Sequence, residues 1–189
     1  WNKGMVCHYD TDSIAQRPGR GYSWKNPSLI SVANRLLRPV DAFHSNTSPV
    51  YVNIATLEFK YLNAIIIATA LGLCLFYITS MPHSAQRTLH TDSIEYAMLL
   101  ILILIFTPLS FTYFYVWLLY PLMVAVHILL AMPCPSRARN LTLIWFLVCL
   151  LLLSFMLPIP GFRWLTAIGS TLYACVLLLG GLGWKLRQL

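Results

Sequence analysis

Charged side chains are scarce in this sequence of 189 residues. Asp, Glu, Lys and Arg together make up 10% of it, and no acidic residue follows Glu95, whereas soluble domains carry about 25% charged residues. Hydrophobic residues reach 58% and the mean hydropathy is +0.69. These values exclude a soluble enzyme, a disordered tail and a nucleic-acid-binding arm. They indicate an integral protein of the cell membrane, with membrane lipid around it.

The sequence also lacks the usual signatures of metal and nucleotide chemistry. It has no CxxC, HxxxH, Walker or GxSxG pattern, and its five cysteines fit neither a disulfide framework nor a zinc site. The apolar stretches contain essentially no ionisable side chain except His127, which argues against an ion-coupled transporter or a proton pump. We therefore predict no metal site and no cofactor.

Basic residues are placed as membrane topology requires. The formal net charge is +7, and seven of the 13 basic residues precede position 61, while the others lie at the ends of apolar stretches. Basic loops are typical of the cytoplasmic side, so Lys185, Arg187, Arg137 and Arg139 place their segments in the cytoplasm and Arg163 lies outside. We expect no nucleic-acid partner.

Residues 1–60 form the only long polar segment. Asn26 suits a helix N-cap, Pro27 suits the first helical position, and Pro39 ends a run of apolar residues at helical spacing. The pattern predicts a short amphipathic helix over 27–38. Such a helix can lie along the membrane surface or simply pack on the bundle, and the pattern alone leaves both open.

Residues 61–189 are predicted to form a transmembrane helical bundle. The tract 96–132 is too long for one crossing of about 30 Å of hydrocarbon, and Pro108 is its natural break, with a kink expected at Pro121. The predicted membrane segments are 62–79, 93–107, 111–132, 141–157 and 164–184. Because 93–107 is short, four or five crossings are possible, and only five place residues 1–60 outside the cell.

Two stretches resemble glycosyltransferase family 87. Lys25-Asn26-Pro27-Ser28-Leu29 followed by Arg35-Leu36-Leu37 resembles the family signature Asn-Gln-Ser-Leu … Arg-Leu-Leu. The stretch from Glu95-Tyr96-Ala97 through Thr107-Pro108-Leu109-Ser110-Phe111 to Tyr115-Val116-Trp117 is similar to the family's Glu … Ser-Pro-Ile-Ser-Trp … His-Tyr pattern. The resemblance covers about residues 22 to 135.

This resemblance implies an all-α, GT-C-type membrane fold and hexosyl or mannosyl transfer. A polyprenyl-phosphate sugar would be the donor substrate, held at the extracytoplasmic face, and a lipid-linked molecule or a glycan would be the acceptor. The resemblance also implies six substrate-binding residues that bond sugar or phosphate, offset phosphate charge or line the cavity: Asn26, Ser28, Arg35, Ser110, Tyr113 and Tyr115.

The general base of such enzymes is typically an aspartate in the first extracytoplasmic loop. By resemblance it would precede Trp1, so we expect no catalytic residue within this chain, no turnover from the chain alone, and an N-terminal membrane half as its partner. The alternative is a non-catalytic membrane subunit or scaffold, which better explains the absence of buried charge and the substituted motif positions, Pro27 and Phe111 among them.

Overall fold

The chain is helical throughout most of the part that can be described. The computed structural model describes residues 22–43, 50–83, 87–108, 112–133, 136–155 and 162–188. In these ranges the β-type pairing is limited to one isolated bridge between Asp41 and Tyr51. The all-α prediction is confirmed. The helices are α1 (Leu29–Leu37), α2 (Phe59–Ser80), α3 (Leu89–Phe106), the 3-10 helix η3 (Thr112–Leu118), α4 (Leu119–Ala131), α5 (Arg137–Ser154), α6 (Arg163–Ile168) and α7 (Ser170–Leu186).

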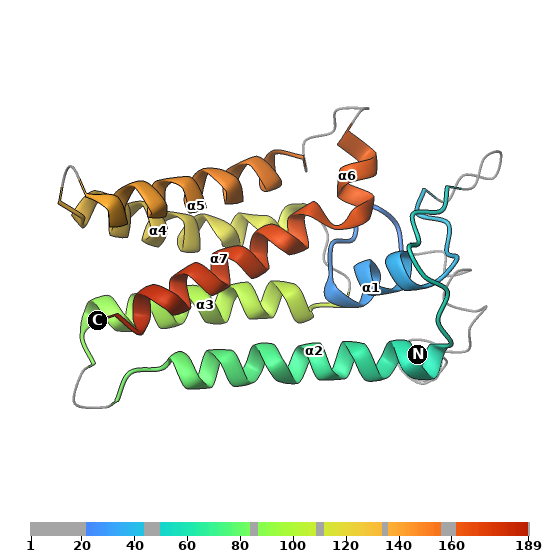
Figure 1. Ribbon diagram of the computed structural model, residues 1–189, viewed down its shortest axis with the longest axis horizontal. Helices are drawn as coiled ribbons and strands as arrows, with labels where there is room; N and C mark the ends of the chain where they lie inside the picture. Colours follow the sequence, from blue (N-terminus) through green and yellow to red (C-terminus); the bar gives the residue numbers. More distant parts are fainter. Residues whose placement is uncertain are drawn as a thin grey trace.

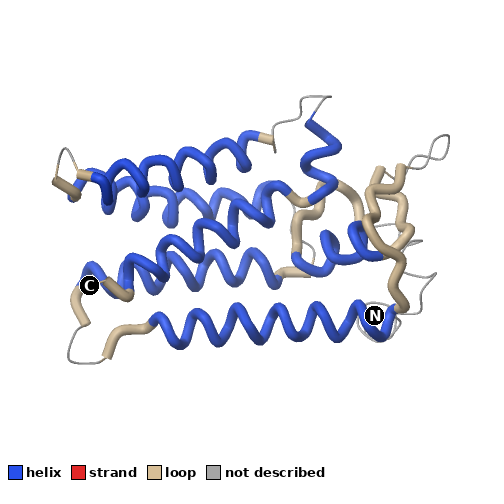
Figure 2. Tube along the Cα trace, in the orientation of Figure 1, coloured by secondary structure: helices blue, strands red, loops and turns tan. Residues whose placement is uncertain are grey.

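The long helices lie side by side and alternate in direction. Figure 1 shows α2, α3, α4, α5 and α7 running along the length of the molecule, with α1 and α6 together at one end. We call this the α1 end. The C-terminus lies at the opposite end, the C-terminal end, together with the residues that follow α2 and α4. Loops join the helices at these two ends, as Figure 2 shows.

Four stretches are long and apolar enough to cross a membrane: Phe59–Ser80, Leu89–Phe106, Tyr113–Ala131 and Arg137–Ser154. The first four predicted segments overlap these stretches, and α7 is apolar but has 17 residues. α2 leaves large apolar side chains such as Leu71, Leu75 and Ile78 exposed along its length. A continuous apolar face of this size is stable against lipid and unstable against water, which supports a membrane location.

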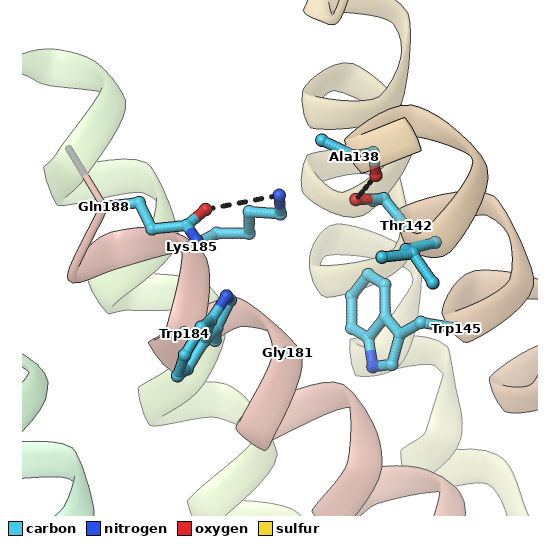
Figure 3. A pocket seen from close by; sticks show the side chains of 8 residues that line it. Ala138, Thr142, Trp145, Gly181, Trp184, Lys185 and Gln188 are labelled. Atoms are coloured by element: carbon cyan, nitrogen blue, oxygen red, sulfur yellow. Dashed lines mark hydrogen bonds between the residues drawn. The ribbon is translucent and has the colours of Figure 1, made fainter. Parts of the chain in front are cut away.

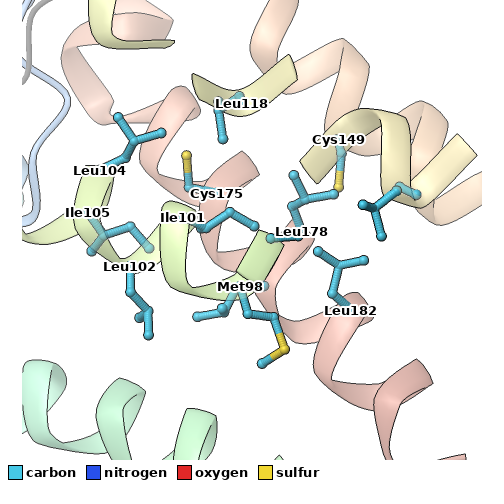
Figure 4. Packing of buried hydrophobic residues seen from close by; sticks show 14 of the residues in the cluster. Met98, Ile101, Leu102, Leu104, Ile105, Leu118, Cys149, Cys175, Leu178 and Leu182 are labelled. Carbon is cyan, nitrogen blue, oxygen red and sulfur yellow. The ribbon is translucent and has the colours of Figure 1, made fainter. Parts of the chain in front are cut away.

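The core lies between α3 and α7, at the centre of the bundle. Met98 and Ile101 of α3 and Leu178 and Leu182 of α7 are almost completely buried there, and Figure 4 shows their side chains directed toward one another. Cys175 is buried in the same cluster as a free thiol, where it packs as a small apolar side chain.

Proline shapes the connection between α3 and α4. α3 ends at Phe106, just before Pro108, where the sequence predicts the break. The chain then forms η3 and continues into α4, so Pro121 lies in the first turn of an α-helix, where a missing N–H costs little. The irregularity expected at Pro121 is instead a change from 3-10 to α geometry immediately before it.

Glycine divides the last predicted segment, 164–184, into α6 and α7. Gly169 has φ of 105°, and its N–H bonds back to the carbonyls of Leu165 and Thr166. A Cβ atom at this position would lie 2.6 Å from Cγ1 of Val32 in α1. Gly169 therefore allows the turn and also the close approach of α1 to the α6–α7 corner.

Replacing Gly169 tests this corner. Gly169→Ala should lower the free energy of unfolding by about 2–4 kcal/mol, because alanine disfavours positive φ and its methyl group would overlap Val32. Gly180→Ala is the matched control: nothing lies within 4 Å of its added Cβ, so helix propensity alone should stabilise the protein by about 0.5–1 kcal/mol. Thermal unfolding in detergent measures both, and equal effects of the two variants would contradict this account.

Candidate functional site at the α1 end

Asn26 and Ser28 fix the start of α1. The Ser28 Oγ atom accepts the N–H of Ser31 at 3.3 Å as an N-cap, and Asn26 Oδ1 accepts the N–H of Ser28 at 3.2 Å. Asn26 Nδ2 and Ser28 Oγ both donate to the carbonyl of Pro108, at 3.0 and 3.3 Å. Both side chains are buried. They join the start of α1 to the end of α3.

The Arg35 side chain is completely buried close to the start of α1. Its Nε atom donates to the carbonyl of Ala167 at 2.8 Å. Its Nη1 atom lies within hydrogen-bonding distance of four further oxygens: the carbonyls of Tyr22, Ser23 and Asn26 and the hydroxyl of Ser31. One side chain thus joins the segment before α1, α1 itself and α6.

The charge on Arg35 has no carboxylate counterpart in the described residues, where the ion pair found is Arg87 with Glu95 at 3.3 Å. Its Nη2 atom is buried there without a hydrogen-bond partner. Burial lowers the pKa of Arg35 to about 9, and Tyr115 and Tyr173 act in the opposite direction. The guanidinium is therefore charged at pH 7. Because this pKa lies below the ordinary 12.5, the charge costs stability at low and neutral pH, and the cost is relieved only as the pH rises past about 9.

The other three predicted residues differ in their placement. Tyr115, on η3, is half-buried and close enough to Arg35 to act on its pKa. Tyr113 is 65% exposed and its ring lies against Phe114. Ser110 lies outside the described residues. The structure thus brings Asn26, Ser28, Arg35 and Tyr115 together, while Tyr113 is on the surface, and their roles in substrate binding stay predictions.

A group of aromatic and basic side chains at the α1 end was not predicted. The Phe43 ring packs edge-on against Trp24 and Trp164, with ring centres 6.3 and 5.8 Å apart. Lys25 Nζ lies 5.5 Å from the centre of the Trp24 ring, and the Arg163 guanidinium lies 5.8 Å from it. We call these five residues the Trp24 platform. They come from segments that are far apart in the sequence, so no local pattern reveals them.

An apolar groove between α2 and α3 reaches the same end. It encloses about 660 Å³. Its walls include Tyr77 and Ile78 of α2 and Ile103 of α3, and its lining extends to Pro108. Because the Pro108 carbonyl accepts hydrogen bonds from Asn26 and Ser28, the groove extends to the start of α1.

His127 lies beside a second histidine, His90. Its ring centre lies 5.6 Å from that of His90, in an edge-to-face arrangement, and both line a cavity between α3 and α4. Across the ranges described, no three His, Cys, Asp or Glu residues are grouped so that they could hold a metal ion.

Comparison of the chain with known families, with curated proteins and with solved structures gives no match. The resemblance to glycosyltransferase family 87 therefore depends on the sequence motifs alone.

Substitution of Arg35 tests its structural role. Arg35→Ala should lower the free energy of unfolding by about 3–5 kcal/mol, because it leaves a cavity and several buried carbonyls without a donor. Arg38→Ala, at the C-cap of α1 and only partly buried, should cost less than about 1 kcal/mol. Chemical unfolding in detergent measures both values. A loss for Arg35→Ala no larger than that for Arg38→Ala would show that Arg35 does not hold this end together.

Proposed function

We propose that this chain is the C-terminal membrane part of a glycosyltransferase that uses a polyprenyl-phosphate sugar, and that the α1 end binds the donor. The Trp24 platform carries the proposal. Aromatic faces stack on the apolar face of a hexose, and cations beside them attract phosphate. Lys25 and Arg163 lie over the Trp24 ring, and Trp164 in the same group is half-exposed, so the platform brings together the aromatic surface and the cations that a phosphosugar needs.

The groove between α2 and α3 suits the isoprenoid tail of such a donor. Its lining is largely apolar, and it extends to Pro108 beside α1. An isoprenoid chain in this groove would be removed from water, and burial contributes about 0.8 kcal/mol for each CH₂ group. The tail in the groove would bring the phosphate toward the α1 end, where Lys25 and Arg163 lie.

Asn26, Ser28 and Arg35 then position the site rather than contact the donor. Their side chains are buried and bonded to Pro108, Ala167 and the segment before α1. The unneutralised charge of Arg35 still contributes a positive field at this end, because buried charges are screened less than exposed ones. In this proposal, the three motif residues of the family resemblance, Asn26, Ser28 and Arg35, determine the shape of the donor site.

The proposed reaction is an inverting transfer. The acceptor hydroxyl oxygen attacks C1 of the sugar, the bond between C1 and the phosphate oxygen breaks, and polyprenyl phosphate leaves. The hydroxyl proton passes to a carboxylate base, which accelerates such a step by about two to four powers of ten. The resemblance implies that this base belongs to the N-terminal partner half, and the proposal keeps it there. Two described acids lie at the α1 end: Asp41 accepts the N–H groups of Phe43 and Val50, and Glu58 precedes the first turn of α2.

A scaffold role is the second candidate. The observation that favours it is the internal bonding of Asn26, Ser28 and Arg35, since a purely structural α1 end would look the same. Donor binding separates the two candidates, because a scaffold has no reason to bind a polyprenyl-phosphate sugar at Trp24.

The Trp24 platform can be tested on the chain itself with polyprenyl-phosphate mannose as the probe. Trp24→Ala should weaken its binding about five- to tenfold, because the stacking surface is lost. Trp117→Ala is the control, since Trp117 is a half-exposed tryptophan outside the platform, and it should change binding less than twofold. Titration in detergent measures the affinities. Equal losses in the two variants, or no saturable binding by the unaltered chain, would reject the donor site.

The proposal also requires the α1 end to face outward. Lys25 is exposed at this end, and Lys185 lies at the C-terminal end. Lys185 therefore serves as an internal control for the labelling of Lys25. A membrane-impermeant amine reagent on intact cells should label Lys25 and spare Lys185, and lysis should expose Lys185. Peptide mass spectrometry reads both sites in one sample. The reverse pattern would place the Trp24 platform in the cytoplasm and rule out an extracytoplasmic donor site.

A further inference from the structure

A second cavity lies at the C-terminal end, between α5 and α7. It encloses about 470 Å³, and Ala138, Thr142 and Trp145 of α5 face Gly181, Trp184 and Lys185 of α7 across it. Figure 3 shows the two tryptophan rings on opposite sides of the space, with the Lys185 side chain extending toward α5. The cavity is far from the α1 end and is independent of the proposed donor site.

The packing of Trp145 on α7 fixes one wall of this cavity. The Trp145 Nε1 atom donates to the carbonyl of Leu177 at 2.9 Å. A Cβ atom at Gly181 would overlap the Trp145 ring, so only glycine admits the ring at this place. Thr142 is held as well, because its hydroxyl donates to the carbonyl of Ala138 at 2.9 Å. The wall is therefore ordered before any ligand binds.

The charge around the cavity is positive. Lys185 Nζ has an amide neighbour, Gln188 Oε1, at 3.4 Å. Arg137 and Arg139 begin α5, and Arg187 follows α7. No Asp or Glu follows Glu95 in the sequence, so α5 and α7 supply no counter-charge. Neighbouring α3 carries two acids: Glu95 is paired with Arg87, and Asp92 is exposed in the first turn of α3, outside the cavity lining.

We infer that this cavity binds one anionic phospholipid, with its head-group phosphate at Lys185 and its acyl chains along the tryptophan rings. Tryptophan is favoured at the boundary between lipid and water, and basic pockets between membrane helices select anionic head groups. The exposed sides of Leu141 and Trp184 open the cavity toward the lipid. A free phosphate ion would leave this apolar lining unused, which favours a lipid over a soluble anion.

Native mass spectrometry of the whole chain tests the inference with phosphatidylglycerol and phosphatidylcholine as probes. Phosphatidylglycerol should bind more tightly than phosphatidylcholine. Lys185→Gln should weaken phosphatidylglycerol binding about fivefold and leave phosphatidylcholine binding unchanged, because one cation near the head group is removed. Lys60→Gln is the matched control. It removes an exposed lysine at the α1 end and should have less than a twofold effect.

Three results would overturn the inference. Equal affinity for the two lipids would show that the cavity does not select charge. Equal losses in Lys185→Gln and Lys60→Gln would show that the selection comes from net charge rather than from this cavity. Displacement of phosphatidylglycerol by an equal concentration of inorganic phosphate would show an anion site without a lipid component.

Discussion

The α1 end depends on one buried cation. Arg35 reaches carbonyl oxygens in the segment before α1 and in α6, and a hydroxyl in α1 itself. The guanidinium group suits this role, because its planar set of donors can serve several acceptors at once. Its burial is costly, as the lowered pKa shows, but the backbone groups around it would lose their donors without it. The polar segment is thereby fixed against a bundle whose described core is apolar.

The bundle, in contrast, is stabilised mainly by apolar contacts. α3 and α7 bury their apolar side chains against each other, whereas α2 leaves most of its apolar surface outward. Such a distribution is stable only where the surroundings are as apolar as the core. The polar and charged groups are therefore concentrated at the two ends of the molecule. Aromatic and basic side chains meet at both ends: around Trp24 at the α1 end, and around Trp145 and Trp184 at the C-terminal end.

This arrangement changes how the motif residues are understood. Asn26, Ser28 and Arg35 are conspicuous polar residues in the sequence, and the resemblance implies that they bind substrate. In the structure their hydrogen bonds are used to join α1 to α3 and α6. The exposed groups nearby are Lys25, Arg163 and Trp164. The hydrogen bonds of these buried side chains therefore hold the α1 end together, whatever contacts a ligand.

The sequence by itself indicated the membrane class and the long apolar helices, because hydropathy and proline act over a few residues. Its expected N-cap of the first helix, Asn26, is wrong: Ser28 caps α1, which begins at Leu29. The resemblance implied that Asn26, Ser28 and Arg35 bind substrate, and that role stays a prediction. Only the tertiary structure decided that Gly169 turns the last segment into two helices, that Arg35 bonds to Ala167, and that Trp24 meets Arg163. The physical reason is distance along the chain. Arg35 is bonded to backbone carbonyls, which every residue has, and glycine is required at position 169 because a Cβ atom there would lie 2.6 Å from Val32 Cγ1 in α1. Neither partner leaves a signal in the local sequence.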